Sequence, residues 1–138
     1  MKATLFLCSL MLLISIAGCN AESEDSNANY GLDGHWNLTH VAGGIDGRNL
    51  VFDPGVIIWT FDENTGMVTI ANTSENVLSV FQSGSYPFSI ENNGNQKSIT
   101  IDGMHFGSFV LFQDQIFINQ QVADGILLEL TKVTFEHF

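Results

Sequence analysis

Side chains able to carry out catalysis or to bind a metal are few in this sequence, and they do not cluster. The chain has four histidines, and no metal-ligand motif matches the spacing of His35, His40, His105 and His137. The turn DENTG, residues 62–66, has oxygen ligands at Asp62 and Asn64 but lacks the remaining ligand positions and the bidentate glutamate of an EF-hand loop. The sequence contains no G-x-S-x-G nucleophile elbow. We therefore expect neither enzyme activity nor a metal or cofactor site.

One of the two cysteines, Cys19, directly follows an apolar segment. Residues 3–18 are almost continuously apolar and come after Lys2, which is the layout of a secretory signal. The segment is shorter than the roughly 20 residues that a membrane-spanning helix needs. A disulfide with Cys8 is the alternative use of Cys19, but Cys8 lies in the segment that signal cleavage removes. We predict a signal peptide over residues 1–18.

The residues Ile16-Ala17-Gly18-Cys19 resemble the lipobox of bacterial lipoproteins. This resemblance implies that the thiol of Cys19 carries a diacylglyceryl group and that the chain is cleaved just before it. Two or more lipid chains hold a protein stably on a bilayer, whereas one does not. The resemblance thus implies a lipoprotein of the bacterial cell envelope, anchored to the outer membrane or at the cell surface.

The stretch after the cysteine, residues 20–33, is polar, acidic and without periodicity, which predicts a flexible tether before a domain over 34–138. Acids so close to Cys19 resemble the surface-export signals of some bacterial lipoproteins, and a solvated linker has the same composition. The whole chain has 15 acidic and 4 basic residues. Such an anionic protein is a poor partner for nucleic acid or an acidic membrane surface. We expect no nucleic-acid partner and membrane contact only through the lipid.

From Gly34 onward, short apolar stretches alternate with turn signals. Eight stretches have strand character, namely HWNLTHV, VIIWTF, MVTIA, SYPFSI, KSITI, MHFGSFVLF, QIFINQ and GILLELTKV. The Asp102-Gly103 pair between two of them is a strong hairpin signal. Consecutive hairpins place strands side by side, and eight antiparallel strands can close into a barrel. We predict an all-β fold, an eight-stranded antiparallel up-and-down β-barrel.

Alternation along the strands predicts which side chains face the barrel interior. The expected interior rows are Trp36, Leu38, His40, Ile57, Trp59, Phe61, Val68, Ile70, Tyr86, Phe88, Ile90, Ile99, Ile101, Met104, Phe106, Ser108, Val110, Phe112, Ile126, Leu128 and Leu130. Phe109, Leu111 and Leu127 then fall on the outer face. There they predict either a covered patch or a self-association surface.

The motif GHWNL, starting at Gly34, is similar to the Gly-x-Trp signature of lipocalins and their calycin relatives. The order of GHWNLTHVAGG, VIIWTF, SGSYPFSI, ITIDGMHFGSF and ADGILLEL resembles the lipocalin-like domain of small bacterial lipoproteins over residues 34–133. The resemblance implies a basic residue stacked on the signature tryptophan at the closed end of the barrel. Lys132 has the parity for a stack on Trp36, and an exposed lysine is the alternative. The helix that follows the last strand of full lipocalins has no counterpart in TFEHF.

Aromatic residues of the interior rows are the candidate ligand contacts, since an apolar lining with few polar groups is typical of a small-molecule site. The candidates are Trp59, Phe61, Tyr86, Phe88, Phe106, Ser108 and Phe112. The alternative is that these rings simply fill the barrel. Arg48 lies in the long connection 43–55, where it either meets an acidic head group or pairs with Asp46 or Asp53.

These residues and the resemblance together predict a barrel that binds a small apolar or amphipathic molecule. The alternative is a protein-interaction or inhibitor module with a solid barrel, because some calycin relatives inhibit proteases. Neither function needs a cofactor.

Overall fold

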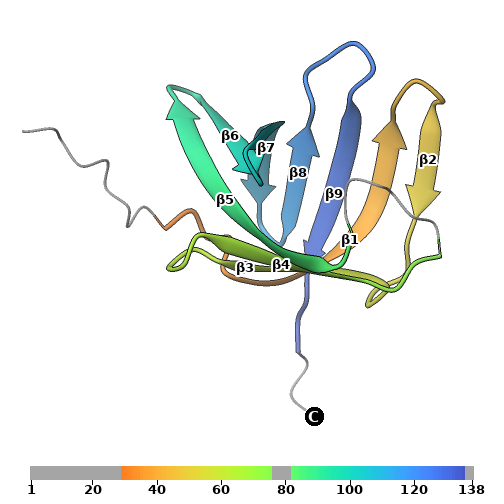
Figure 1. The fold of residues 1–138 in the computed structure, drawn as a ribbon, viewed down its shortest axis with the longest axis horizontal. Helices are drawn as coiled ribbons and strands as arrows, with labels where there is room; N and C mark the ends of the chain where they lie inside the picture. The colour runs from red at the N-terminus through yellow and green to blue at the C-terminus, as the bar shows by residue number, and fades with distance from the viewer. Residues whose placement is uncertain (1–28, 76–81, 136–138) are drawn as a thin grey trace, which may run out of the picture.

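The computed structural model describes residues 29–75 and 82–135, which form β-strands and their connections (Figure 1). The expected signal peptide, residues 1–18, and the expected lipidation site, Cys19, lie outside the described residues. Within the described part of the chain, no helix has the length and apolar character needed to cross a membrane.

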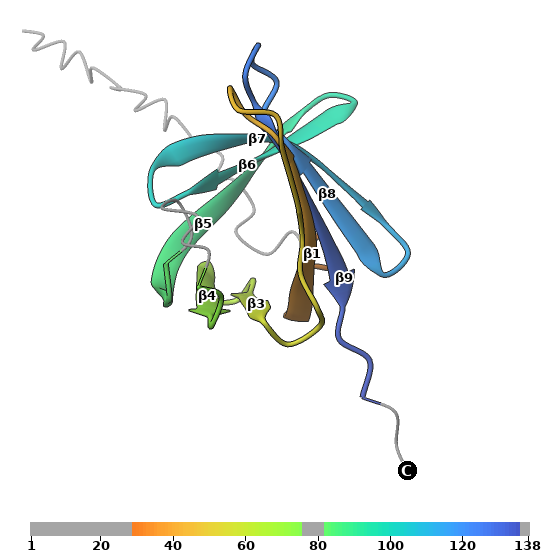
Figure 2. The ribbon, with the colours of Figure 1, turned by 90° about the vertical axis from the view of Figure 1, so that its right-hand side faces the viewer.

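The strands are antiparallel and follow one another around a common interior (Figure 2). They are β1 (Gly34–Gly43), β2 (Arg48–Val51), β3 (Ile57–Asp62), β4 (Met67–Asn72), β5 (Gly84–Asn93), β6 (Gln96–Ile101), β7 (Met104–Phe112), β8 (Gln115–Asn119) and β9 (Ile126–Lys132). Strands β3 to β9 pair in sequence order, and β9 pairs with β1 to complete the ring. The predicted eight-stranded up-and-down barrel is therefore confirmed.

Strand β2 is an addition to this ring. It lies within the connection 43–55, where no strand was predicted. One edge of β1 pairs with β3 at Gly34–Asn37 and with β2 at His40–Gly43. β1 is longer than β3, so its second half has a free edge that the short β2 covers. The opposite edge of β1 pairs with β9, so β1 contacts three strands.

A β-bulge interrupts the pairing of β6 and β7. Ile99 lies opposite Gly107 and Thr100 opposite His105, so Phe106 is an extra residue in β7. Such a bulge shifts the alternation by one position, which sends every later side chain to the other face of the strand.

The β7 bulge overturns the predicted faces of the second half of that strand. Phe109 is buried, with 4% of its surface exposed, and Leu111 is partly buried against the core. Val110 and Phe112 are 58% and 62% exposed. The predictions that Ser108, Val110 and Phe112 face the interior, and that Phe109 and Leu111 face outward, are therefore wrong.

A second bulge lies in β1, where the register with β9 shifts between Leu38 and His40 and leaves Thr39 as the extra residue. Val41, which is fully buried, takes the interior position that was expected for His40. His40 lies on the outer face instead, because the extra residue shifts the alternation by one position, as it does in β7.

The remaining interior rows pack as one apolar core. Two tryptophans from adjacent strands, Trp36 and Trp59, lie opposite each other and are both buried. The other buried apolar residues are Leu32, Leu38, Val41, Phe52, Ile57, Phe61, Val68, Ile70, Ile99, Ile101, Phe106, Phe109, Ile116, Ile118, Leu128 and Leu130. Burial of this apolar surface, at about 25 cal/mol per Å², is the main force that stabilises the barrel.

The up-and-down order assigns every connection to one of two ends. The start of β1, the β3–β4, β5–β6 and β7–β8 turns and the end of β9 lie at one end, which we call the floor. Connection 43–57, the turn at 102–103, loop 120–125 and the described ends of the β4–β5 connection lie at the other end, which we call the mouth. At the mouth the β1–β2 turn and the β8–β9 loop lie side by side (Figure 1), and Gly44 N donates to Gly125 O at 3.2 Å.

Candidate functional site

Residues 29–33 close the floor of the barrel. The indole Nε1 of Trp36 donates to the carbonyl oxygen of Leu32 at 2.7 Å, and the Leu32 side chain is 1% exposed. The carboxylate of Glu63, in the β3–β4 turn, accepts hydrogen bonds from the backbone N–H groups of Tyr30, Leu32 and Asp33. These residues belong to the barrel, so the predicted boundary between tether and domain at residue 34 lies too far along the chain.

Two lysines cover aromatic rings at this floor. Lys132 Nζ lies 5.2 Å from the centroid of the Trp36 ring, which is the placement that the lipocalin resemblance implies. Lys97 Nζ lies 5.3 Å from the centroid of the Tyr30 ring. Each such cation–π contact stabilises by about 0.5–1 kcal/mol at an exposed site. Apolar packing and two cation–π contacts therefore close the floor.

Three of the expected ligand contacts pack against one another in the core. The ring centroids of Trp59 and Phe61 are 6.0 Å apart, and those of Phe61 and Phe88 are 5.2 Å apart at 85°. Trp59, Phe61 and Phe106 are at most 3% exposed. Their first role is thus to fill the barrel, as the alternative interpretation of these rings expected.

Apolar side chains that remain accessible to solvent lie at the mouth. Four strands have one end at the mouth, and near that end each carries one apolar side chain on its interior side. These residues are Leu50 of β2, Tyr86 of β5, Met104 of β7 and Ile126 of β9. Met104 is 53% exposed, and the other three are partly buried against the core. We call these four residues the mouth rim. An accessible apolar rim above a buried core is suited to contact an apolar molecule.

Tyr86 is the only predicted site residue in the mouth rim. Its hydroxyl donates to the backbone oxygen of Gln82 at 3.0 Å, so the ring runs along β5 toward the mouth. The remaining lone pairs of the hydroxyl provide a polar group at the edge of the apolar rim.

Arg48 lies at the mouth, opposite Gly43, and pairs with a neighbouring acid. Its Nε donates to Asp46 Oδ2 at 2.7 Å, and both side chains are about half exposed. The hydrogen bond from Arg48 lowers the pKa of the Asp46 carboxyl. The structure thus supports pairing with an acid, which was one of the two roles expected for Arg48.

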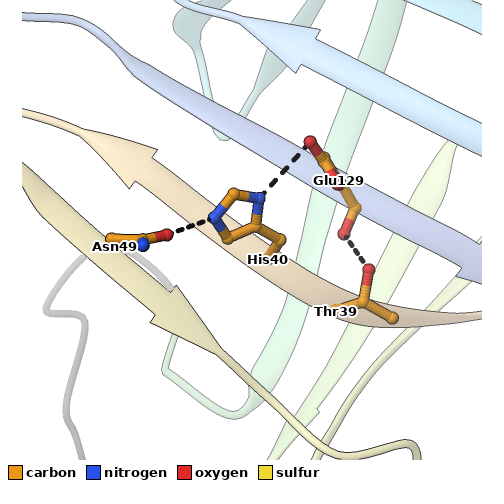
Figure 3. A network of polar contacts seen from close by, with 4 residues as sticks. All are labelled: Thr39, His40, Asn49 and Glu129. Carbon is orange, nitrogen blue, oxygen red and sulfur yellow. Dashed lines mark hydrogen bonds and ion pairs between the residues drawn. The ribbon is translucent and has the colours of Figure 1, made fainter.

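A polar network on the outer face joins β2, β1 and β9 (Figure 3). His40 Nε2 lies 2.6 Å from Asn49 Oδ1, and His40 Nδ1 lies 3.3 Å from Glu129 Oε1. The hydrogen bond with Asn49, followed by that with Glu129, raises the pKa of His40. Beside it, the Thr39 hydroxyl donates to the Glu129 carbonyl oxygen at 3.1 Å. Sequence reasoning missed this network, because the bulge at Thr39 moves His40 from the interior to the surface.

Exposed apolar residues also gather on the outer face of β7 and β8. Val110 and Phe112 follow the β7 bulge, and the partly buried Phe117 lies opposite Val110 on β8. We call these three residues the outer apolar face. The sequence signal for it was Gly107, since a glycine inside a strand often marks a bulge.

Known proteins give no further guide to the function of this site. Among residues 29–75 and 82–135, no group of three or more histidine, cysteine, aspartate or glutamate side chains is placed to hold a metal ion. Comparison of the chain with protein-family models, with curated proteins and with solved structures found no match.

Proposed function

We propose that this protein is a lipid-anchored, lipocalin-like envelope protein that binds a small apolar or amphipathic molecule at the barrel mouth. The observation that carries the proposal is the mouth rim, where four separate strands each present an apolar side chain that solvent can reach. The floor, by contrast, is closed by Leu32 and Trp36. The ligand therefore enters from the mouth.

Binding is driven by removal of apolar surface from water, at about 25 cal/mol per Å². Leu50, Met104 and Ile126 supply the apolar contacts, and the Tyr86 hydroxyl orients a polar group of the ligand. The core beneath the rim is packed, so the ligand lies among the mouth connections and not in the centre of the barrel. No covalent step or turnover is involved.

Attachment through Cys19 rests on the lipobox resemblance of residues 16–19. The barrel begins near Tyr30, and a chain spans at most about 3.6 Å per residue. The stretch from Cys19 to Tyr30 therefore keeps the barrel within a few nanometres of the bilayer. Because residues 29–33 lie at the floor, this tether reaches the barrel at the end opposite the mouth.

Native mass spectrometry of a chain starting at residue 20, incubated with envelope lipid extract, tests ligand binding. We expect an adduct that Leu50→Gln abolishes and Val51→Gln retains. The two residues are neighbours on β2, but Leu50 faces the interior side and Val51 is 77% exposed on the outer face. The proposal fails if no adduct forms, or if the two substitutions have the same effect.

The outer apolar face supports a second candidate function, contact with a protein partner. Val110 and Phe112 are both more than half exposed, although their strand lies in the middle of a closed sheet. The double substitution Val110→Ser with Phe112→Ser is expected to abolish cross-links between this face and a partner, while leaving the mouth adduct unchanged. Cross-links that persist in this variant exclude the candidate.

A further inference from the structure

Exposed carboxylates occur in the connections at the mouth. All four connections contribute at least one, and the acids are Asp46, Asp53, Glu75, Asp102 and Asp124. Each of these side chains is exposed. Any molecule that binds the mouth rim therefore approaches through a field of negative charge.

Basic side chains do not offset this charge at the mouth. Within the described residues Arg48 is the only lysine or arginine at this end, and its guanidinium is held by Asp46. Lys97 and Lys132 both lie at the floor, over Tyr30 and Trp36. Counting Arg48, the described residues of the mouth carry four more negative than positive charges.

We infer that the ligand of the mouth rim is a cationic amphiphile, an apolar body with an ammonium or similarly charged head. This inference rests on the proposed function. When the apolar body lies on the mouth rim, its head lies among the carboxylates, which attract a cation and repel an anion. A carboxylate head has no free cation to pair with among the described residues of the mouth, because Arg48 is already paired with Asp46.

The carboxylates act over a short range. Exposed charges are screened beyond about 8 Å at physiological ionic strength, so acids at the floor have little influence on a head group at the mouth. The preference for a cation is therefore expected to depend on the mouth acids in particular, and to weaken in high salt.

Photo-labelling with three matched probes tests the inference. The probes share one diazirine-bearing alkyl chain and end in an ammonium, a hydroxyl or a carboxylate. Each is irradiated with the full chain in phosphatidylcholine nanodiscs, and labelled peptides that contain Leu50, Tyr86, Met104 or Ile126 are quantified. We expect the ammonium probe to label these peptides at least about fivefold more than the carboxylate probe in low salt, and the ratio to fall toward one at about 0.5 M salt.

Two double variants with the same change in net charge provide the control. Asp102→Asn with Asp124→Asn removes mouth acids, whereas Glu91→Gln with Asp114→Asn removes exposed floor acids. The mouth variant is expected to lose most of the ammonium preference, and the floor variant to keep it.

The outcomes separate this inference from the proposed function. If all three probes label the mouth and the carboxylate labels as well as the ammonium, the cationic ligand is excluded and mouth binding stands. Equal effects of the mouth and floor variants also exclude it. If no probe labels the mouth above its labelling of surface peptides elsewhere, the proposed function fails and the cationic ligand fails with it.

Discussion

Replacement of Gly107 by alanine is the most direct test of the β7 bulge. Gly107 has a φ of +122°, a conformation that residues with a side chain rarely adopt. A Cβ atom at this position would lie 2.1 Å from the backbone oxygen of Asn119 and 2.7 Å from its carbonyl carbon. Both atoms belong to the neighbouring strand β8, so no side-chain rotation relieves the overlap.

The expected cost has two parts. The left-handed conformation costs an L-residue about 1–2 kcal/mol. Forcing an extra methyl group into a packed site typically costs a further 1–3 kcal/mol. Gly107→Ala is therefore expected to lower the free energy of unfolding by about 3 kcal/mol, a large share of the roughly 5–15 kcal/mol of a typical domain.

Urea unfolding followed by tryptophan fluorescence measures this change, since both tryptophans are buried in the core. Gly94→Ala is the matched control, because Gly94 also has a positive φ, +70°, but a Cβ there meets no atom within 4 Å. It is expected to cost only the strain of the left-handed conformation, about 1–2 kcal/mol. If the two variants lose equal stability, Gly107 is not in close contact with β8 and the bulge is not as described.

Three further substitutions test the contacts that hold the barrel together. The pKa of His40 is raised above its ordinary 6.5 in the folded protein, so the stability of the wild type relative to His40→Gln is greatest below pH 6.5 and declines as the pH rises through the higher folded value. The urea midpoints of both proteins at pH 5.5 and pH 8.5 measure this decline. A difference between the two proteins that is the same at both pH values contradicts it. Glu63→Ala removes the acceptor of three backbone N–H groups and is expected to lower the free energy of unfolding by about 2 kcal/mol, with faster proteolysis at residues 29–33. Glu91→Ala, at the same end of the barrel, is the control and is expected to change stability by less than about 0.5 kcal/mol. Lys132→Met keeps the apolar stem over Trp36 but removes the charge. It is expected to lower the free energy of unfolding, measured in urea, by about 0.5–1 kcal/mol. An unchanged free energy of unfolding rules out a stabilising cation–π contact.

The architecture was predictable because local signals and global pattern agree in most strands. Alternation placed Ile57, Trp59 and Phe61 in the interior, and each is buried. The Asp102-Gly103 turn set the pairing of β6 with β7 at Ile101 and Met104, as expected. Short strands with tight turns leave an antiparallel meander few alternative arrangements.

The errors lie where one residue interrupts the alternation. Nothing in the residue types of HWNLTHV shows that Thr39 is extra, because the bulge arises where β1 passes from β3 to β2 while paired with β9. A shift set by pairing between distant strands is invisible to a pattern read along one strand. The β7 bulge differs, because Gly107 marks it within the strand, but strict alternation still predicted that Phe109 and Leu111 face outward.

The mouth and floor were the least predictable parts. β2 exists because β1 extends beyond β3, and the strand RNLV has little strand character of its own. At the floor, the composition of residues 20–33 predicted a tether, but the Leu32 side chain is buried and its carbonyl oxygen accepts from Trp36 Nε1. Composition averages over a segment and does not detect one anchoring residue.

The pairing of β1 with β9 has a consequence for how the chain reaches this structure. These two strands come from the beginning and the end of the domain, and Trp36 lies opposite Lys132. Contacts between residues so far apart in sequence form slowly, because a long loop must close before they are made. Until the last strand has been synthesised, β1 and β8 both present unpaired edges, which are templates for aggregation. A ribosome-bound or truncated chain that lacks β9 is thus the species most in need of a chaperone.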